Sequence, residues 1–156
     1  MLKLSITAAI ALSVLLSGCA VLQSQPREVV DNTRTYVAAR DVMWDRILQE
    51  SARNSMIIRR ADPANGVITA ERQIASPRAN SIYDWARCGW DDVLARALSQ
   101  RVEITYLVQR GAGGTVVTVN GRFQELRLAN PVQKAQWVSC ATTGALERNL
   151  LDSLYE

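Results

Sequence analysis

The chain contains no histidine among its 156 residues. Histidine is the commonest general base and the commonest protein ligand of transition metals. Its absence excludes Ser-His-Asp and Cys-His catalysis and histidine-based metal sites. We therefore expect no catalytic residues, no metal and no cofactor, and a protein that is not an enzyme.

A large excess of charge is also lacking, because the formal net charge is only +3 at pH 7. That value is too small to indicate a nucleic-acid partner. Hydrophobic residues make up 48% of the chain and charged residues 21%, which is typical of a folded domain. The length fits about one such domain.

Apolar runs long enough to span a membrane are missing as well. The run over residues 4–16 is thirteen residues long and follows Lys3. A membrane-spanning helix needs about 20 residues. A positive charge followed by a run of this shorter length is typical of a secretory signal peptide, so we expect residues 1–18 to be one.

The segment Leu16-Ser17-Gly18-Cys19 resembles the lipobox of bacterial lipoproteins. The resemblance implies cleavage before Cys19, diacylglycerol on its thiol and acylation, for example with palmitate, of its amine. Two or more acyl chains anchor a protein stably. The next residue is Ala20, which by the lipoprotein sorting rule favours the outer membrane and a domain facing the periplasm. In a Gram-positive host the anchor would lie in the outer leaflet of the plasma membrane. The alternative is an ordinary signal peptide cleaved nearby, with Cys19 a free thiol.

Only Cys88 and Cys140 remain after Cys19, and they lie 52 residues apart. Disulfides persist in exported proteins, so the simplest prediction is a bridge between these two. The alternatives are two buried free thiols or a redox pair. The absence of a CxxC motif argues against an oxidoreductase.

The rest of the chain predicts a tether over 19–34 and one α+β domain over 35–156. We expect a strand over 35–38, a helix over 41–53 with Asp41 as N-cap, and a hairpin of strands 56–60 and 67–72. A second hairpin pairs alternating strands over 101–109 and 115–125 through the glycine-rich loop 111–114. A final helix is expected from Thr142 or Thr143. Residues 75–100 are hardest to interpret: 82–85 favours a strand, and Asp91-Asp92 a short helix that includes Ala97 and Leu98.

This order, β-α-β-β-β-β-α, predicts an antiparallel sheet of four to five strands with two helices packed on one face. In the last helix, leucines at helical spacing form an apolar stripe: Leu146, Leu150, Leu151 and Leu154. Gly121 shares a strand face with bulky residues, which predicts a bulge or a close helix approach.

Aromatic residues gather near the two cysteines. If the disulfide forms, it draws a candidate partner surface together: Tyr83, Trp85, Trp90 and Trp137. Tryptophan and tyrosine dominate binding hot spots. The alternative is that they pack around the disulfide as core.

Other charged features have simpler explanations. Asp84 with Asp91 and Asp92 could hold a cation or act as acid and base, but the pattern is also that of a solvated turn. An arginine group could contact anionic lipid or polysaccharide, or form an ordinary solvated hairpin: Arg59, Arg60, Arg72 and Arg78.

Residues 36–72 combine a strand, Asp41-Val42-Met43-Trp44, a helix, and a hairpin with Asp62 and Asn65-Gly66. This stretch resembles the repeated helix-grip modules found in a lipoprotein component of the outer-membrane β-barrel assembly machinery. The resemblance implies a similar local fold and does not carry function.

Together these features predict a membrane-anchored lipoprotein that binds another envelope protein as a subunit or accessory of an assembly or secretion complex. The alternative is a carrier or chaperone for a small apolar or lipid ligand held between the sheet and its helices.

Overall fold

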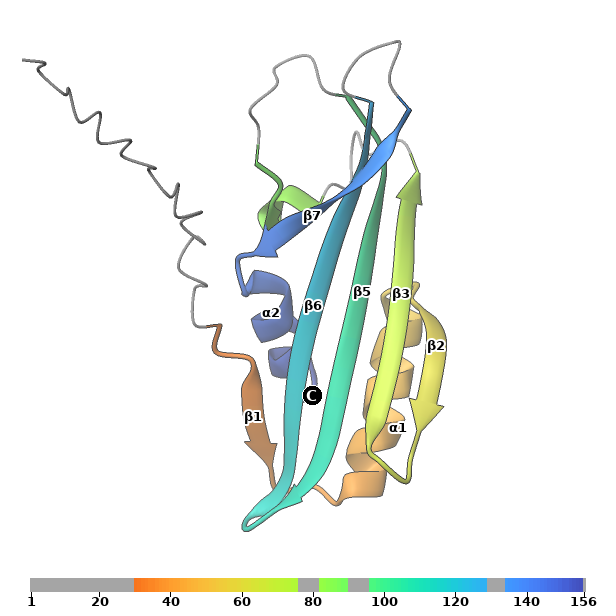
Figure 1. Ribbon diagram of the computed structural model, residues 1–156. Helices are drawn as coiled ribbons and strands as arrows, with labels where there is room; N and C mark the ends of the chain where they lie inside the picture. Colours follow the sequence, from red (N-terminus) through yellow and green to blue (C-terminus); the bar gives the residue numbers. More distant parts are fainter. Residues whose placement is uncertain (1–29, 76–81, 90–95, 129–133, 156) are drawn as a thin grey trace, which may run out of the picture.

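The computed structural model describes residues 30–75, 82–89, 96–128 and 134–155. These residues form an α+β fold in which a twisted sheet carries two helices (Figure 1). In chain order the elements are β1 (Thr33–Tyr36), α1 (Arg40–Arg53), β2 (Ile57–Asp62), β3 (Val67–Ala75), the 3-10 helix η1 (Ile82–Asp84), β4 (Ala86–Arg87), β5 (Arg96–Gly111), β6 (Gly114–Leu128), β7 (Gln136–Thr142) and α2 (Ala145–Ser153).

The sheet within this described part has seven strands in the order β2-β3-β5-β6-β7-β4, with β1 paired to β6. Every strand pair is antiparallel. The long hairpin of β5 and β6 is the centre of the fold, and its strands stay in register from the tight turn between Gly111 and Gly114 as far as Ser99 opposite Leu126. Gly114 has φ +140°, and a Cβ there would collide with the Tyr36 carbonyl oxygen, so the turn requires glycine.

Both helices lie on the same face of the sheet (Figure 1). Alternate strand side chains point toward them, as the period of a strand requires. The buried strand residues include Ile68, Val102, Ile104, Tyr106, Val108, Val117, Val119 and Phe123. They form one core with α1 and α2, to which the helices contribute Met43, Ile47, Leu150, Leu151 and Leu154. The apolar stripe expected for the last helix is therefore confirmed.

The outer edge of β6 has a gap that α2 fills. β1 pairs with β6 up to Thr118, and β7 pairs from Phe123 onward. Between them the backbone N–H of Gly121 donates to Oε1 of the buried Glu147 side chain, 3.2 Å away. A Cβ on Gly121 would lie 2.8 Å from that oxygen. Gly121 thus marks a close helix approach, one of the two predicted outcomes.

Three sequence-based predictions were wrong. The sheet has seven strands rather than four to five, because β4 and β7 were missed. β4 has only two residues, and β7 is mostly exposed on both faces, so neither carries a hydrophobic alternation. Residues 82–85 form the 3-10 helix η1 and a turn instead of a strand, and Ala97 and Leu98 belong to β5 instead of a helix.

Element boundaries also differ. β1 begins at Thr33, two residues inside the predicted tether. The N-cap of α1 is Ala39, which places Asp41 in the first turn. β6 continues to Leu128 because a bulge between Ala97 and Ser99 on β5 absorbs the change in register. None of the helices in the described ranges is long and apolar enough to cross a membrane.

Candidate functional site

A disulfide joins Cys88 to Cys140, as the sequence predicted, with an S–S distance of 2.00 Å. It ties the segment 82–89 to β7, where Cys140 lies opposite Phe123 of β6. Asp91, Asp92 and Cys19 lie outside the described residues.

Beside the disulfide lies a fully buried carboxylate, Glu125, on the helix-facing side of β6. Its Oε2 accepts hydrogen bonds from the Tyr83 hydroxyl at 2.8 Å and from Gln100 Nε2 at 3.1 Å. Its Oε1 accepts from Arg127 Nε at 2.7 Å. Burial, together with the Glu125 carboxylate, raises the pKa of Tyr83 to about 12. Burying a charge requires such partners, so this cluster is structural.

The same cluster holds the segment 82–89 against the sheet. Arg127 donates from Nη1 to the Gly89 carbonyl at 2.8 Å, and from Nη2 to the Cys88 carbonyl. The Ile82 N–H donates to Gln100 Oε1 at 3.1 Å. The Thr143 N–H donates to the Trp85 carbonyl at 2.8 Å. Side chains of the sheet thus add to the short backbone ladder between β4 and β7, which pairs only Ala86 and Arg87 of this segment.

Of the candidate aromatics that the structure describes, Tyr83 and Trp85 lie on one side of the sheet and Trp137 on the other. Tyr83 and Trp85 are partly buried and pack against the core. Trp137 faces the other side of the sheet, because it lies opposite Leu126, and the residue before Leu126, Glu125, points to the core. Trp90 lies outside the described residues.

Trp137 is 37% exposed and lies on the face of the sheet opposite α1 and α2, which we call helix-free because neither helix of the described residues packs there. The guanidinium carbon of Arg101 sits 4.6 Å from the centre of a Trp137 ring, in a cation–π contact. Arg101 Nε is 3.5 Å from a Glu71 oxygen, and Arg59 Nε is 3.3 Å from the other oxygen. The exposed indole is therefore held by a row of charges that crosses from β2 to β7.

The expected arginine face is partly neutralised. Arg59 pairs with Glu71, and Arg60 pairs with Asp62 at 2.8 Å. Arg72 donates to the Asn54 carbonyl at 3.5 Å. Arg78 lies outside the described ranges. A basic surface made by these residues is weaker than their number implies.

Two other sequence features have plain structural roles. The loop 111–114 joins two strands, as a hairpin loop should. Asp84 is exposed, and its backbone carbonyl accepts from the Thr143 hydroxyl at 3.2 Å. Within the parts of the chain that the structure describes, no group of three or more cysteine, aspartate or glutamate side chains is placed to hold a metal ion.

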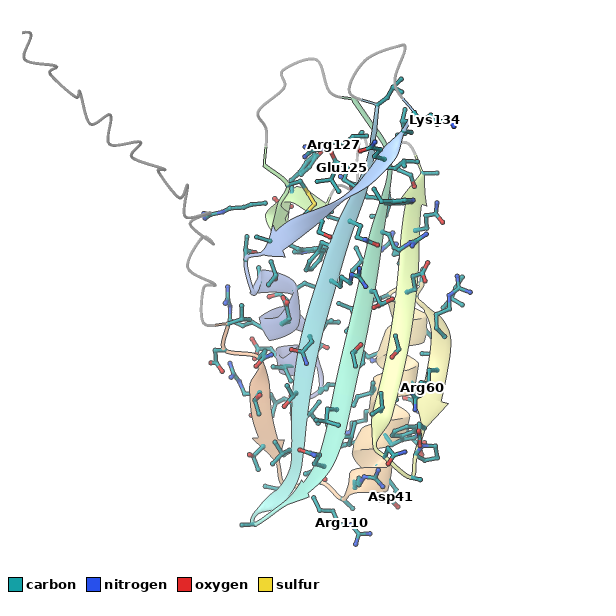
Figure 2. All side chains as sticks on the ribbon, viewed as in Figure 1. Asp41, Arg60, Arg110, Glu125, Arg127 and Lys134 are labelled. Atoms are coloured by element: carbon teal, nitrogen blue, oxygen red, sulfur yellow. A yellow bond between two sulfur atoms is a disulfide. The ribbon has the colours of Figure 1, made fainter. Side chains whose placement is uncertain are left out.

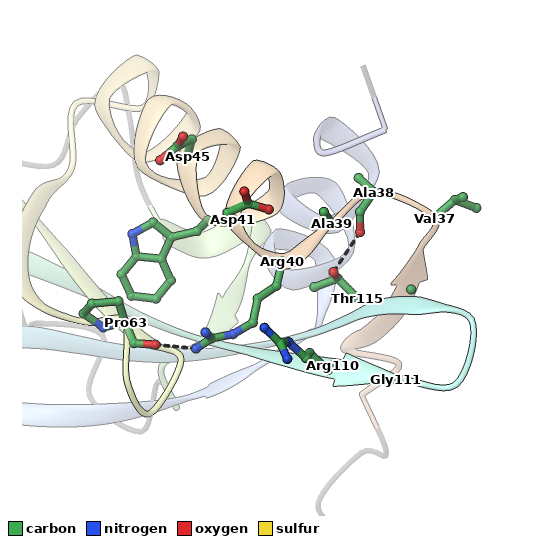
Figure 3. A pocket seen from close by; sticks show the side chains of 12 residues that line it. Val37, Ala38, Ala39, Arg40, Asp41, Asp45, Pro63, Arg110, Gly111 and Thr115 are labelled. Carbon is green, nitrogen blue, oxygen red and sulfur yellow. Dashed lines mark hydrogen bonds between the residues drawn. The ribbon is translucent and has the colours of Figure 1, made fainter.

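A cleft that sequence reasoning missed lies at the opposite end of the sheet from the disulfide (Figures 2 and 3). It has a volume of about 710 Å³ and is formed where the β1–α1 connection, the start of α1, the β2–β3 turn and the β5–β6 hairpin meet. Arg40 braces it, donating from Nε to the Val108 carbonyl at 3.1 Å and from Nη2 to the Pro63 carbonyl at 2.5 Å. The Thr115 hydroxyl donates to the Ala38 carbonyl at 2.8 Å.

Charges of both signs line this cleft. Asp41 and Asp45 lie along α1, and Arg110 lies on the opposite wall, on β5 (Figure 3). Among the described residues, none of these three side chains has an ion-pair or hydrogen-bond partner. Trp44 is partly buried and lines the cleft together with Pro63. No local sequence motif indicates this cleft, because the residues that line it come from separate segments of the chain.

Known protein-family models give no match to this chain, and neither do curated protein sequences.

Proposed function

We propose that the chain is a periplasmic lipoprotein, anchored in the outer membrane through Cys19, that serves as a non-enzymatic binding subunit or accessory of an envelope assembly or secretion complex. The observation that carries this proposal is the helix-free sheet face with an exposed, braced Trp137 on it. Partner recognition needs a surface of this kind, and catalysis does not.

The composition of that face supports a protein partner. Trp137 combines a large apolar area with a donor group, as binding hot spots do. Arg101 fixes the indole before any partner arrives, which lowers the entropic cost of binding. The neighbouring polar side chains Gln124 and Ser139 lie opposite each other on β6 and β7, and they offer a polar rim.

The short tether supports an envelope location. Only residues 20–32 separate Cys19 from β1. Thirteen fully extended residues span ~45 Å at most, and a coil of the same length spans a shorter distance. The domain would therefore work close to the membrane surface, where envelope complexes are assembled.

The packing of the core weighs against the carrier alternative. The space between the sheet and the helices is filled by large, fully buried side chains, among them Tyr106, Phe123 and Met43. A ligand held there would have to displace them, at the cost of their packing.

The test is site-specific photo-crosslinking in cells that express the protein natively. A photoreactive residue at Gln124 or Ser139 should give a discrete adduct with an envelope protein. The same residue at Asp152, exposed on α2 on the helical side, is the control and should give none. In parallel, Cys19→Ser should remove the chain from the membrane fraction or leave it uncleaved. Equal labelling from both faces, or none from either, would remove the basis of the proposal.

A further inference from the structure

We propose that the cleft at the end of the sheet binds the headgroup of a zwitterionic phospholipid, with the phosphate beside Arg110 and the ammonium beside Asp41 and Asp45. This inference goes beyond the binding function assigned to the sheet face, and it concerns the opposite end of β5 and β6.

The arrangement of charge is the first argument. The carboxylates of Asp41 and Asp45 lie on one wall and the guanidinium of Arg110 on the other (Figure 3). A simple anion would be repelled by the first wall and a simple cation by the second. A ligand that carries both signs a few ångströms apart matches both walls at once.

The aromatic wall is the second argument. Trp44 lies between Asp41 and Asp45 in the sequence, on the first turns of α1, and it lines the cleft. An ammonium group over an indole is attracted by the ring quadrupole, and tryptophan provides the strongest such contact. Two carboxylates and an indole from the first turns of α1 therefore offer a cation subsite, and Arg110, which has no partner among the described residues, lies on the opposite wall.

The backbone around the cleft argues against an added peptide strand. Strand addition needs unpaired backbone groups. Here the carbonyls of Pro63 and Val108 accept from Arg40, and that of Ala38 accepts from Thr115. The Ala39 carbonyl accepts from the Met43 N–H within α1. Side-chain charge and aromatic surface remain as the means of recognition.

The rim of the cleft points to a membrane as the source of the ligand. Val37 lines the cleft and is 94% exposed, the highest value among the exposed large hydrophobic residues of the described chain. An exposed apolar side chain beside a headgroup site can enter the interfacial region of a bilayer. β1 alone, Thr33–Tyr36, lies between Val37 and the tether. Four strand residues span only ~13 Å, so the tether can bring the cleft to the membrane.

The first test is a titration of the purified full-length lipoprotein, in an uncharged detergent, with soluble probes followed by saturation-transfer NMR. Glycerophosphoethanolamine should bind about tenfold more tightly than glycerophosphoglycerol or ethanolamine, each of which carries one charge. Triglycine, a zwitterion of peptide chemistry, should also bind about tenfold more weakly. Equal binding of all probes, or a preference for triglycine, would overturn the proposal.

Variants locate the site. Arg110→Gln and the double variant Asp41→Asn/Asp45→Asn should each weaken glycerophosphoethanolamine binding about tenfold. Arg122→Gln and Asp152→Asn replace exposed charges elsewhere and should leave it unchanged. All four variants change exposed side chains, so each should fold with an unaltered circular dichroism spectrum. Binding that survives both cleft replacements would contradict the assignment.

A membrane measurement identifies the source of the headgroup. A photoreactive phosphatidylethanolamine, added to membranes that carry the lipoprotein, should label the wild-type chain at residues of the cleft. Labelling should fall about tenfold in Arg110→Gln, in line with the loss of soluble headgroup binding. Undiminished labelling of that variant, or labelling spread over the chain, would show that the lipid does not occupy the cleft.

Discussion

The two ends of the sheet use the same kinds of side chain in opposite ways. At the disulfide end, the Glu125 carboxylate is buried, and the largely covered Arg127 guanidinium donates to it from Nε at 2.7 Å. At the cleft end, Asp41, Asp45 and Arg110 are exposed and, within the described residues, unpaired. A charge that is buried must be paired to be tolerated, whereas an exposed charge remains available to a ligand. The buried, paired charges therefore contribute to stability, and the exposed charges of the cleft remain free to bind a ligand.

The disulfide should be the largest single contributor at the stable end. It closes a loop with a sequence separation of 52. In the chain-entropy model, removing it costs about 4 kcal/mol. We expect the double variant Cys88→Ser/Cys140→Ser to lose that free energy of unfolding in a denaturant titration. An unchanged midpoint would mean that the bridge has no structural role.

The Glu125 cluster comes next. Glu125→Gln keeps the side-chain shape but removes the charge that Arg127 and Tyr83 face. We expect a loss of about 2–3 kcal/mol, the range of a hydrogen bond to a charged group in a buried site. The exposed Asp41→Asn change at the other end is the matched control and should stay within about 0.5 kcal/mol. Equal losses of stability in the two variants would contradict the different roles that we give to the buried and the exposed charges.

Gly121 offers a test of the α2 contact. In Gly121→Ala the new Cβ would lie 2.8 Å from Glu147 Oε1 and from the Phe123 ring, so one of them must shift. Overpacking of this kind costs about 1–3 kcal/mol. Gly113→Ala is the control, because nothing lies within 4 Å of a Cβ at that position. Thermal unfolding of the two variants side by side measures the difference.

The pH dependence near Tyr83 should be smaller still. Its pKa rises from 10.0 to about 12 on folding, so between these values the folded chain keeps a proton that the unfolded chain has released. Stability must then fall as pH rises from about 10 through 12. Tyr83→Phe should make that decline shallower. It should not abolish it, because burial also raises the pKa of Tyr36 and Tyr106. Denaturation midpoints at about pH 9 and about pH 11 would show the difference.

The sequence predicted the fold class, both helices, two hairpins and the disulfide, because each leaves a local signal. Leucines at helical spacing identify α2, and the alternation of apolar and polar residues identifies β5 and β6. The strand β7 left no such signal, since Trp137 and Val138 are both partly exposed. The cleft left none either, because Asp41, Pro63 and Arg110 converge only through the tertiary fold. The aromatic surface was predicted from closeness to the cysteines, which could not show that Trp137 and Trp85 point to opposite sides of the sheet.

The most direct test of the account pairs two tryptophans that differ in burial. Trp85 packs against the core, and Trp137 lies exposed on the helix-free face. Trp85→Ala should lower the melting temperature through a loss of about 3 kcal/mol. Trp137→Ala should leave the melting temperature unchanged and cost about 2 kcal/mol or more in partner binding, measured by recovery of the crosslinked partner. Full partner recovery by a normally folded Trp137→Ala chain would contradict the account.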